Sequence, residues 1–360
     1  MNFTSEDNVN LKAEIKYDKQ EFIFSKRQFL LVSKEENDYS YFQARVIDLD
    51  KTQKKIIILF NKFDKKLKNG CYNIKEDESF VSLERMEKAL NTLKLKDTLM
   101  NEDILALIIG KEKTEKEKPV SNINKFLEGK LLPRKLNISI LIDIILNRSQ
   151  DFALRNCLKH KLTVIKGPPG TGKSTVLLFL AYHLLKLISF NTKIFIGAPS
   201  NRAGDNISAL LQKVGIDFIR VLSIEKEIAD DVDKTNSLED LVQQEIDKDL
   251  EKNKRFQKLK EKRYKYGFLK GKDESEYQEI IKRIEYKILN SKQIIISNLN
   301  NAADKRLEEC EFPIVIIDEA TKALEPDCLL PLIHKAQMVV MIGDEKQLGP
   351  TLVSQENLYV

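Results

Sequence analysis

The sequence predicts an α/β fold, a parallel sheet with helices on both faces, and three observations carry that prediction. Six short apolar runs, separated by helical stretches, follow one another through the second half of the chain: residues 162–165, 193–197, 218–222, 293–297, 313–318 and 338–344. A glycine-rich turn directly follows the first run. The chain is 32% charged but has only 13 glycines and 9 prolines, which favours solvated helices over loop-rich β architecture. Apolar strands joined by crossover helices are typical of parallel sheets buried on both faces.

Length and composition set further bounds. A chain of 360 residues exceeds what one hydrophobic core usually supports, so we expect two or three domains. No apolar run reaches the ~18 residues that cross a bilayer, and the N-terminus lacks a secretory signal, which predicts a cytoplasmic protein, with the nucleus as alternative and no membrane partner. The four cysteines and three histidines are scattered without metal-ligand spacing, so we expect neither disulfides nor zinc. The net charge of +5 permits a nucleic-acid partner without arguing for one.

The first part of the chain divides into two segments. Residues 1–80 alternate short β-branched and aromatic runs with polar turns, which predicts a small β-rich, barrel-like module. Residues 81–145 begin with helical spacing and are expected to form a helical connector. Its apolar face is predicted to carry Leu83, Met86, Leu90 and Leu93. Residues 111–119 contain no apolar side chain and end in proline, so they are expected to be an exposed loop.

The second part is expected to form one nucleotide-binding domain, residues 146–236 and 291–360, interrupted by an insertion. Residues 237–290 are charged, helical in pattern and without a strand candidate, which predicts a helical hairpin. Its second arm places Tyr277, Ile280, Ile284 and Ile288 along one face.

The glycine-rich turn carries the strongest functional signal. Residues 167–174 fit the pattern G-x-x-x-x-G-K-[S/T] between a predicted strand and a predicted helix. Such a loop cradles phosphates with backbone N–H groups, its lysine reaches the β- and γ-phosphates, and its serine ligates Mg²⁺. We therefore assign phosphate contact to the loop and the residue after it, with Lys173 also catalytic and Ser174 on the metal: Gly167, Pro168, Pro169, Gly170, Thr171, Gly172, Lys173, Ser174 and Thr175.

Acidic and polar residues follow two later strands. Asp318 and Glu319 end the run 313–318, where side chains emerge at the ligand-binding edge of a parallel sheet. Asp318 is predicted to hold Mg²⁺ and Glu319 to act as the base that orients the attacking water. Gln347 follows the last run and is a candidate sensor of the γ-phosphate. Each signal is weak alone, and the upstream loop strengthens it.

Two more short segments complete a pattern of five: Ala198 to Asn201, with Asp205 shortly after, and Leu146 to Gln150. In this order the five elements resemble the superfamily-one helicases of the Upf-like, 5′ to 3′ branch. Within that branch, the ending Leu348-Gly349-Pro350 is most similar to the nonsense-mediated decay helicase type.

The resemblance implies the N-terminal half of an ATP-dependent RNA or DNA helicase or translocase, including the first RecA-like domain, with ATP and Mg²⁺ as cofactors. It assigns Gln150 to the adenine base, and Ser200 and Asn201 to the phosphates of single-stranded nucleic acid, RNA rather than DNA. It also makes residues 1–80 similar to subdomain 1B and residues 237–290 similar to subdomain 1C, both of which flank the nucleic-acid channel. Residues 251–270 carry nine basic side chains against two acidic ones, which fits a nucleic-acid surface and equally fits a solvated helical face.

The sequence departs from the family in two places. The third of the family's motifs ends ten residues before Val360, so we expect the second RecA-like domain to be missing and a second polypeptide to be a candidate to supply it. Alone, the chain is expected to bind nucleotide, to hydrolyse it poorly and to unwind nothing, because a second domain supplies arginines across the cleft. Asn298 and Asn300 replace the usual Thr and Gly of another motif, so no role is carried over to them.

Two alternatives remain. A degenerate helicase relative would bind nucleic acid or a protein partner, with nucleotide as a structural ligand and no turnover. A GTPase would use Asn61-Lys62-Phe63-Asp64 to recognise guanine, but this short pattern lies far upstream of the phosphate loop and chance explains it better.

Overall fold

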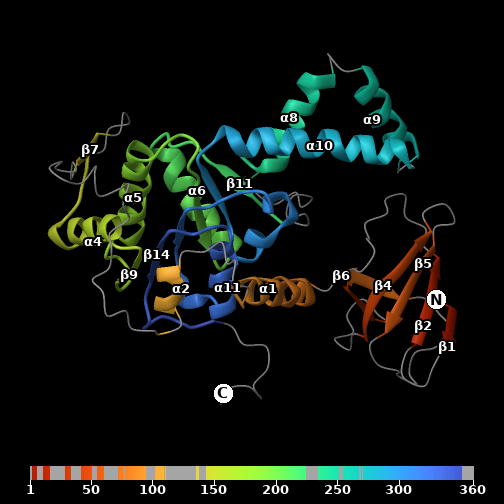
Figure 1. Ribbon diagram of the computed structural model, residues 1–360, viewed down its shortest axis with the longest axis horizontal. Coiled ribbons are helices and arrows are strands. Elements are labelled where there is room, and N and C mark those ends of the chain that lie inside the picture. The colour runs from red at the N-terminus through yellow and green to blue at the C-terminus, as the bar shows by residue number, and fades with distance from the viewer. Residues whose placement is uncertain are drawn as a thin grey trace. The chain divides into compact units, whose positions relative to one another are not determined.

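A computed structural model describes residues 2–5, 11–16, 29–33, 42–50, 55–60, 72–76, 78–94, 102–108, 110, 135–137, 143–223, 234–250, 254–266, 269 and 271–350 (Figure 1). The chain forms two compact units, residues 1–85 with 255–275 and residues 86–254 with 276–360. Within the described ranges, no helix has the length and apolarity to cross a membrane.

The N-terminal strands form one antiparallel sheet, as the alternation of apolar and polar runs predicts. The strands are β1 (Asn2–Ser5), β2 (Leu11–Lys16), β3 (Phe29–Ser33), β4 (Phe42–Asp50), β5 (Lys55–Phe60) and β6 (Asn73–Glu76), in the order β1-β2-β5-β4-β3-β6. Alternate residues of β3 and β4, among them Leu30, Val32, Ala44 and Val46, are fully buried, as one covered face requires. The N-K-x-D pattern at residues 61–64 lies outside the described residues.

Helices and one strand pair follow this sheet. Helix α1 spans Glu78–Lys94, α2 spans Glu102–Ile108, and β7 (Lys135–Asn137) pairs antiparallel with β8 (Asp143–Ile145) inside the range expected to be helical. The predicted apolar face of α1 is partly wrong, because Leu83 and Leu90 are exposed while Met86 and Ala89 are buried. The buried face of α1 contains Met86 and Ala89, which are three residues apart and therefore neighbours on the helix surface. The face thus includes an alanine in place of the leucines that were predicted to be buried. The loop predicted at 111–119 lies outside the described residues.

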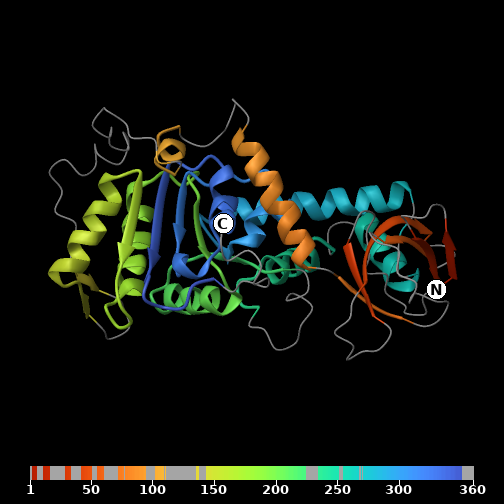
Figure 2. The same cartoon turned by 90° about the horizontal axis from the view of Figure 1, so that it is seen from below.

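The second half contains the predicted parallel sheet, and all six apolar runs form its strands. They are β9 (Leu162–Lys166), β10 (Ile194–Ala198), β11 (Ile219–Val221), β12 (Ile294–Asn298), β13 (Ile314–Ile317) and β14 (Met338–Gly343). The order is β11-β12-β10-β13-β14-β9, and every neighbouring pair is parallel. Figure 2 shows these strands side by side.

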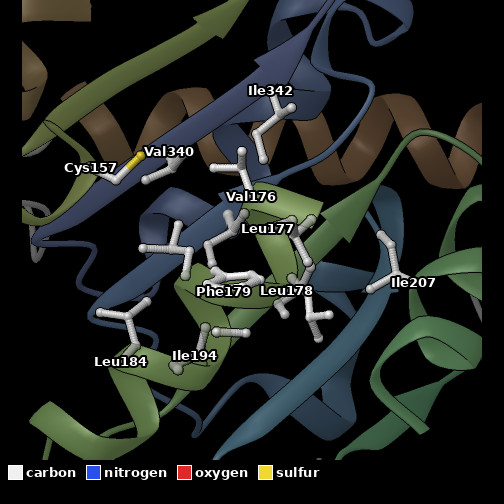
Figure 3. Close-up of a cluster of buried hydrophobic side chains, with 14 of the residues drawn as sticks. Cys157, Val176, Leu177, Leu178, Phe179, Leu184, Ile194, Ile207, Val340 and Ile342 are labelled. Atoms are coloured by element: carbon white, nitrogen blue, oxygen red, sulfur yellow. The ribbon is translucent and has the colours of Figure 1, made fainter. Parts of the chain in front are cut away.

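Both faces of this sheet are covered, and alternate residues of the same strands face each side. On one face α4 (Arg148–Lys159), α5 (Lys173–Leu187) and α6 (Asn201–Lys213) pack on Ile194, Val340 and Ile342 (Figure 3). On the other face the tilted rings of Phe195 and Phe312 lie with centroids 5.2 Å apart, and Phe312 in turn lies 5.0 Å from the ring of His334. Each of these apolar side chains stabilises the fold by about 1.5–3 kcal/mol when fully buried.

The inserted segment contains three helices where a two-armed hairpin was predicted: α8 (Leu238–Leu250), α9 (Lys254–Tyr266) and α10 (Lys272–Ser291). On α10 the residues Ile280, Ile284 and Ile288 are buried, as their spacing predicts. Short helical turns complete the fold: η1 (Asn300–Ala303), η2 (Lys305–Leu307), η3 (Ala320–Lys322), α11 (Glu325–Leu329) and η4 (Leu330–Ile333).

Candidate nucleotide site and the carboxyl edge of the sheet

The carboxyl ends of the six parallel strands lie at one edge of the sheet, where open α/β folds bind ligands. The strand order divides this edge into two halves. We call the ends of β9, β14 and β13 the nucleotide half, because they carry the glycine-rich loop, Gln347 and the acidic pair. The ends of β10, β12 and β11 form the second half, where Ser200 and Asn201 lie.

The glycine-rich loop joins β9 to α5 and is shaped by two left-handed residues. Gly170 has φ +78° and Gly172 has φ +82°, a region that costs other residues about 1–2 kcal/mol. Gly172 also caps α5, and a Cβ there would lie 2.3 Å from the Gln150 Nε2 atom. The first N–H groups of a helix have no intrahelical acceptor, so the start of α5 offers donors and a positive dipole end to an anion.

Lys173 is the first residue of α5, and its ammonium group folds back over the loop. Its Nζ atom donates to the carbonyl oxygens of Gly167 at 2.5 Å and Pro168 at 3.1 Å. A cation held over a concave loop is positioned for phosphate oxygens.

Gln150 lies in the first turn of α4 and has both ends of its amide engaged. Its Oε1 atom accepts from the Asn147 N–H at 3.0 Å, which completes a capping box, and its Nε2 atom donates to the Thr171 carbonyl at 3.0 Å. The predicted adenine-reading residue thus also contacts the phosphate loop, a contact that sequence reasoning did not predict.

The acidic pair follows β13. The Asp318 N–H donates to the Gly197 carbonyl at 2.8 Å, and its Oδ1 atom accepts from the Glu319 N–H at 2.9 Å. Burial raises the pKa of Asp318; the Glu319 N–H lowers it, the charge of Glu319 raises it, and Lys173 lowers it. Glu319 has φ +53°, which is uncommon for a residue with a side chain and is a backbone conformation enriched at functional sites. Its carboxylate lies 3.2 Å from the Lys322 ammonium.

Ser174 and Asp318 line the same cavity of about 230 Å³, together with residues of α5 and α6. A hydroxyl and a carboxylate are hard oxygen donors, the kind that Mg²⁺ prefers. Burial disfavours the charged form of the Asp318 carboxyl, and a bound cation would stabilise that charged form. The residues present therefore fit a magnesium ion beside the phosphate loop.

The end of β14 is tied to the acidic segment. The Thr321 hydroxyl donates to the Asp344 carbonyl at 3.1 Å and accepts from the Asp344 N–H at 3.2 Å. Asp344 is 5% exposed, and its Oδ2 atom accepts from the Gln347 Nε2 atom at 3.0 Å. Gln347 thus has its amide held at the nucleotide half of the edge, and the Gly167 N–H joins the loop to the same strand through the Gly343 carbonyl at 3.2 Å.

The predicted nucleic-acid residues lie in the second half, at the start of α6. Ser200 caps that helix, with its hydroxyl oxygen accepting from the Ala203 N–H at 3.2 Å. Asn201 is the first helical residue, and its Oδ1 atom accepts from the Asn298 Nδ2 atom at 3.1 Å. The structure thus brings Asn298, to which no role was assigned, beside Asn201.

Sequence reasoning missed three residues of this edge. Thr321 follows the predicted acidic pair but was given no role, and Asn298 was set aside for departing from the family pattern. The third, Arg220, is a charged side chain inside an otherwise apolar strand, and that mismatch was the signal available in the sequence.

A phosphate loop at the end of one strand, with an acidic pair two strands away, defines a P-loop nucleoside-triphosphate-binding domain. The family model described as an AAA domain matches residues 145–270 and 247–355. The chain belongs to this family, and within it to the Upf-like superfamily-one helicases.

Two curated relatives support that placement. Regulator of nonsense transcripts 1 from Dictyostelium discoideum is 30% identical over 80% of this chain and 20% of its own length. ATP-dependent helicase NAM7 from Saccharomyces cerevisiae is 33% identical over 62% of this chain and 22% of its own length. The chain thus spans about a fifth of the length of each. Among solved structures, the UvsW helicase of bacteriophage T4 gives a TM-score of 0.37 at 10% identity, covering 67% of this chain and 68% of the UvsW chain.

Proposed function

We propose that the carboxyl edge of the parallel sheet binds ATP with Mg²⁺ and hydrolyses it, as the ATP-binding part of a helicase or translocase that acts on single-stranded nucleic acid. The observation that carries this proposal is the convergence at the nucleotide half. There the loop after β9, with its left-handed glycines and Lys173, lies at the same sheet edge as Gln347 after β14 and the Asp318–Glu319 pair after β13.

The roles follow from the contacts. The loop from Gly167 to Thr175 would hold the phosphates, and Lys173 would exchange its two carbonyl partners for phosphate oxygens. Ser174 and Asp318 would hold Mg²⁺, which when bound neutralises charge on the phosphates. Gln150 would leave the Thr171 carbonyl to read adenine, so base binding would loosen one contact of the loop.

Hydrolysis needs a group that accepts a proton from water. Glu319 is the carboxylate next to the proposed metal ligand. Its left-handed backbone conformation gives its side chain a different direction from the one it would have in an extended strand. Lys322 holds that carboxylate at 3.2 Å and would have to yield it to water. Gln347, fixed by Asp344, would report the γ-phosphate to the end of β14.

The nucleic-acid part of the proposal rests on Ser200 and Asn201, which start a helix at the second half of the edge. Helix starts bind phosphates well. The relatives are named as regulators of nonsense transcripts and as an ATP-dependent helicase, which favours RNA over DNA as the strand bound. The division into four parts, residues 1–80, 81–145, 146–236 with 291–360, and 237–290, belongs to the same proposal. In it, residues 1–80 and 237–290 would flank the bound nucleic acid.

The test is steady-state ATP hydrolysis by the 360-residue chain, with and without single-stranded RNA or DNA of equal length. We expect nucleotide to bind with Mg²⁺ in a manner that depends on Lys173, with only slow turnover that is lost in Lys173→Ala. Robust turnover stimulated by nucleic acid would contradict the expectation that arginines from a second domain are needed for fast hydrolysis. Turnover that persists in Lys173→Ala would contradict the site, and stimulation by DNA alone would contradict the choice of RNA.

A further inference from the structure

Arg220 is a charged residue at the centre of a buried strand. It lies in β11 between Ile219 and Val221, and only 2% of its surface is exposed. Burial lowers its pKa, and the nearby Asp205 carboxylate raises it. Taking a guanidinium out of water is costly even when it is paired, and a buried ion pair seldom adds stability over apolar packing. Stability alone therefore does not account for an arginine at this position.

The guanidinium is directed at the first turn of α6. Its Nη2 atom donates to the Asn201 carbonyl oxygen at 2.9 Å and to the Asp205 Oδ1 atom at 3.0 Å. Its Nε and Nη1 atoms have no hydrogen-bond partner among the described residues. Three of the five N–H donors of Arg220 thus have no partner among the described residues, and the two on Nη2 both bond to α6.

Helix α6 is shaped to admit this side chain. A Cβ atom on Gly204 would lie 2.0 Å from Nη1 and 2.3 Å from Nη2 of Arg220. Gly204 lies within α6, where a glycine destabilises the helix by about 1 kcal/mol relative to alanine. The absence of a side chain at Gly204 leaves room for the Arg220 guanidinium. The guanidinium occupies that space.

The same turn is held from a second side. The Asn201 side chain accepts from Asn298 at the end of β12, while the Asn201 main chain accepts from Arg220 on β11. Both the backbone and the side chain of Asn201 are therefore fixed by neighbouring strands. A lysine would not reproduce this, because it carries a single point charge instead of a planar fork of donors.

We propose that Arg220 is a positioning residue for nucleic-acid binding, which acts by fixing the backbone of Asn201 so that Ser200 and Asn201 meet the phosphates of the strand. The inference rests on the proposed function, since it assumes that these two residues touch nucleic acid. Arg220 itself is buried and does not contact the ligand.

The test measures two affinities on the full chain: that for a fluorescein-labelled 12-nucleotide oligouridine by anisotropy, and that for a fluorescent ATP analogue with Mg²⁺. In Arg220→Lys and in Gly204→Ala we expect RNA affinity to fall about tenfold, while nucleotide affinity stays within about twofold. Arg155→Lys is the matched control, because Arg155 also pairs with an aspartate, at 3.0 Å from Asp151. Both of these residues lie on α4, away from α6. It is expected to leave RNA affinity unchanged.

A combined variant separates positioning from general stability. If Arg220 acts by placing Ser200 and Asn201, then Arg220→Lys added to Ser200→Ala with Asn201→Ala causes no further loss of RNA affinity. Additive losses, or equal losses of RNA and nucleotide affinity, would overturn the inference. Should Arg220→Lys fail to fold, Gly204→Ala and Asp205→Asn decide the matter on the same two measurements.

The outcomes also separate this inference from the proposed function. Unchanged RNA affinity in folded variants of a wild type that does bind RNA would overturn the role of Arg220 and leave the function standing. A wild type that binds nucleotide but no RNA would overturn the nucleic-acid part of the function and this inference with it.

Discussion

The two halves of the carboxyl edge are held in shape by different means. In the nucleotide half, the phosphate loop takes its form mainly from the left-handed Gly170 and Gly172 and from the bonds of Lys173 to its own loop, with Gln150 of α4 as an added contact. In the second half, the start of α6 is held by side chains from two other strands, Arg220 and Asn298.

This difference has a physical consequence. A site shaped by local backbone geometry needs particular residues at fixed short spacing, so a substitution there acts directly on the site. A site shaped by side chains from distant strands depends on the packing of the sheet, so a substitution acts through other residues. The following predictions test where that division holds.

The largest expected effect is on turnover in the nucleotide half. Replacing Glu319 with glutamine keeps the shape of the side chain but removes the proton acceptor, so turnover should fall by roughly 10²–10⁴-fold, the usual contribution of a general base. Affinity for the ATP analogue should stay within about twofold. The measurement is phosphate release with RNA present, and Glu345→Gln, a change in an exposed carboxylate nearby, is the control. Wild-type turnover in Glu319→Gln would mean that another group accepts the proton.

Two glycines of the loop offer a matched pair. Gly170 and Gly172 both have positive φ, but a Cβ at Gly170 would meet nothing within 4 Å, whereas a Cβ at Gly172 would meet Gln150. Gly170→Ala should therefore lower the free energy of unfolding by roughly 1–2 kcal/mol from backbone strain alone. Gly172→Ala should cost roughly 1–3 kcal/mol more from the close contact. Urea denaturation measures both, and equal losses would show that the contact with Gln150 does not constrain the loop.

The buried carboxyl of Asp318 predicts a dependence of stability on pH and Mg²⁺. Because the pKa of Asp318 in the fold is raised above the ordinary value of 3.8, its contribution to stability is full below that value and is lost as pH rises through the raised pKa. Without metal, Asp318→Asn should raise the free energy of unfolding at neutral pH by roughly 0.5–2 kcal/mol. It should also abolish stabilisation by Mg²⁺ with nucleotide. Thermal melts over a pH series, with and without Mg²⁺, test both, and a destabilised variant would contradict this account of the carboxyl.

The smallest expected effect on ligand binding is at the junction between β14 and the acidic segment. Thr321→Val keeps the shape of the side chain but removes the hydroxyl that bridges to Asp344, which should cost roughly 1–3 kcal/mol because it leaves buried groups of Asp344 unpaired. Nucleotide affinity should fall modestly and RNA affinity should not change. A change in RNA affinity of equal size would show that the two halves are coupled through this contact.

Sequence reasoning succeeded where local pattern determines structure. The six apolar runs predicted the strands of the parallel sheet, because strands buried on both faces have few polar residues, and the loop motif predicted the start of α5 at Lys173. The apolar face of α1 was partly wrong, because spacing alone does not say which of several apolar residues meets a neighbour. The inserted segment forms three helices where two were predicted, because helical spacing does not show where one helix ends and the next begins.

The contacts of the second half could not be predicted, since they join residues far apart in the chain. Asn201 and Asn298 are separated by 97 positions, and Arg220 reaches α6 from a strand that follows it. Periodicity carries no information on such pairs. The engagement of Gln150 with the loop is of the same kind, since it depends on how α4 packs beside β9.

The most direct test of the account is titration of the chain with a fluorescent ATP analogue and Mg²⁺, comparing wild type with Lys173→Ala and Lys186→Ala. Both lysines lie on α5, but Lys186 contacts Tyr182 at the other end of the helix. The account predicts that Lys173→Ala weakens binding by about 100-fold or more, since a desolvated charge pair with phosphate is lost, while Lys186→Ala binds like wild type. Equal, tight binding by all three proteins would contradict the assignment of the nucleotide to this edge.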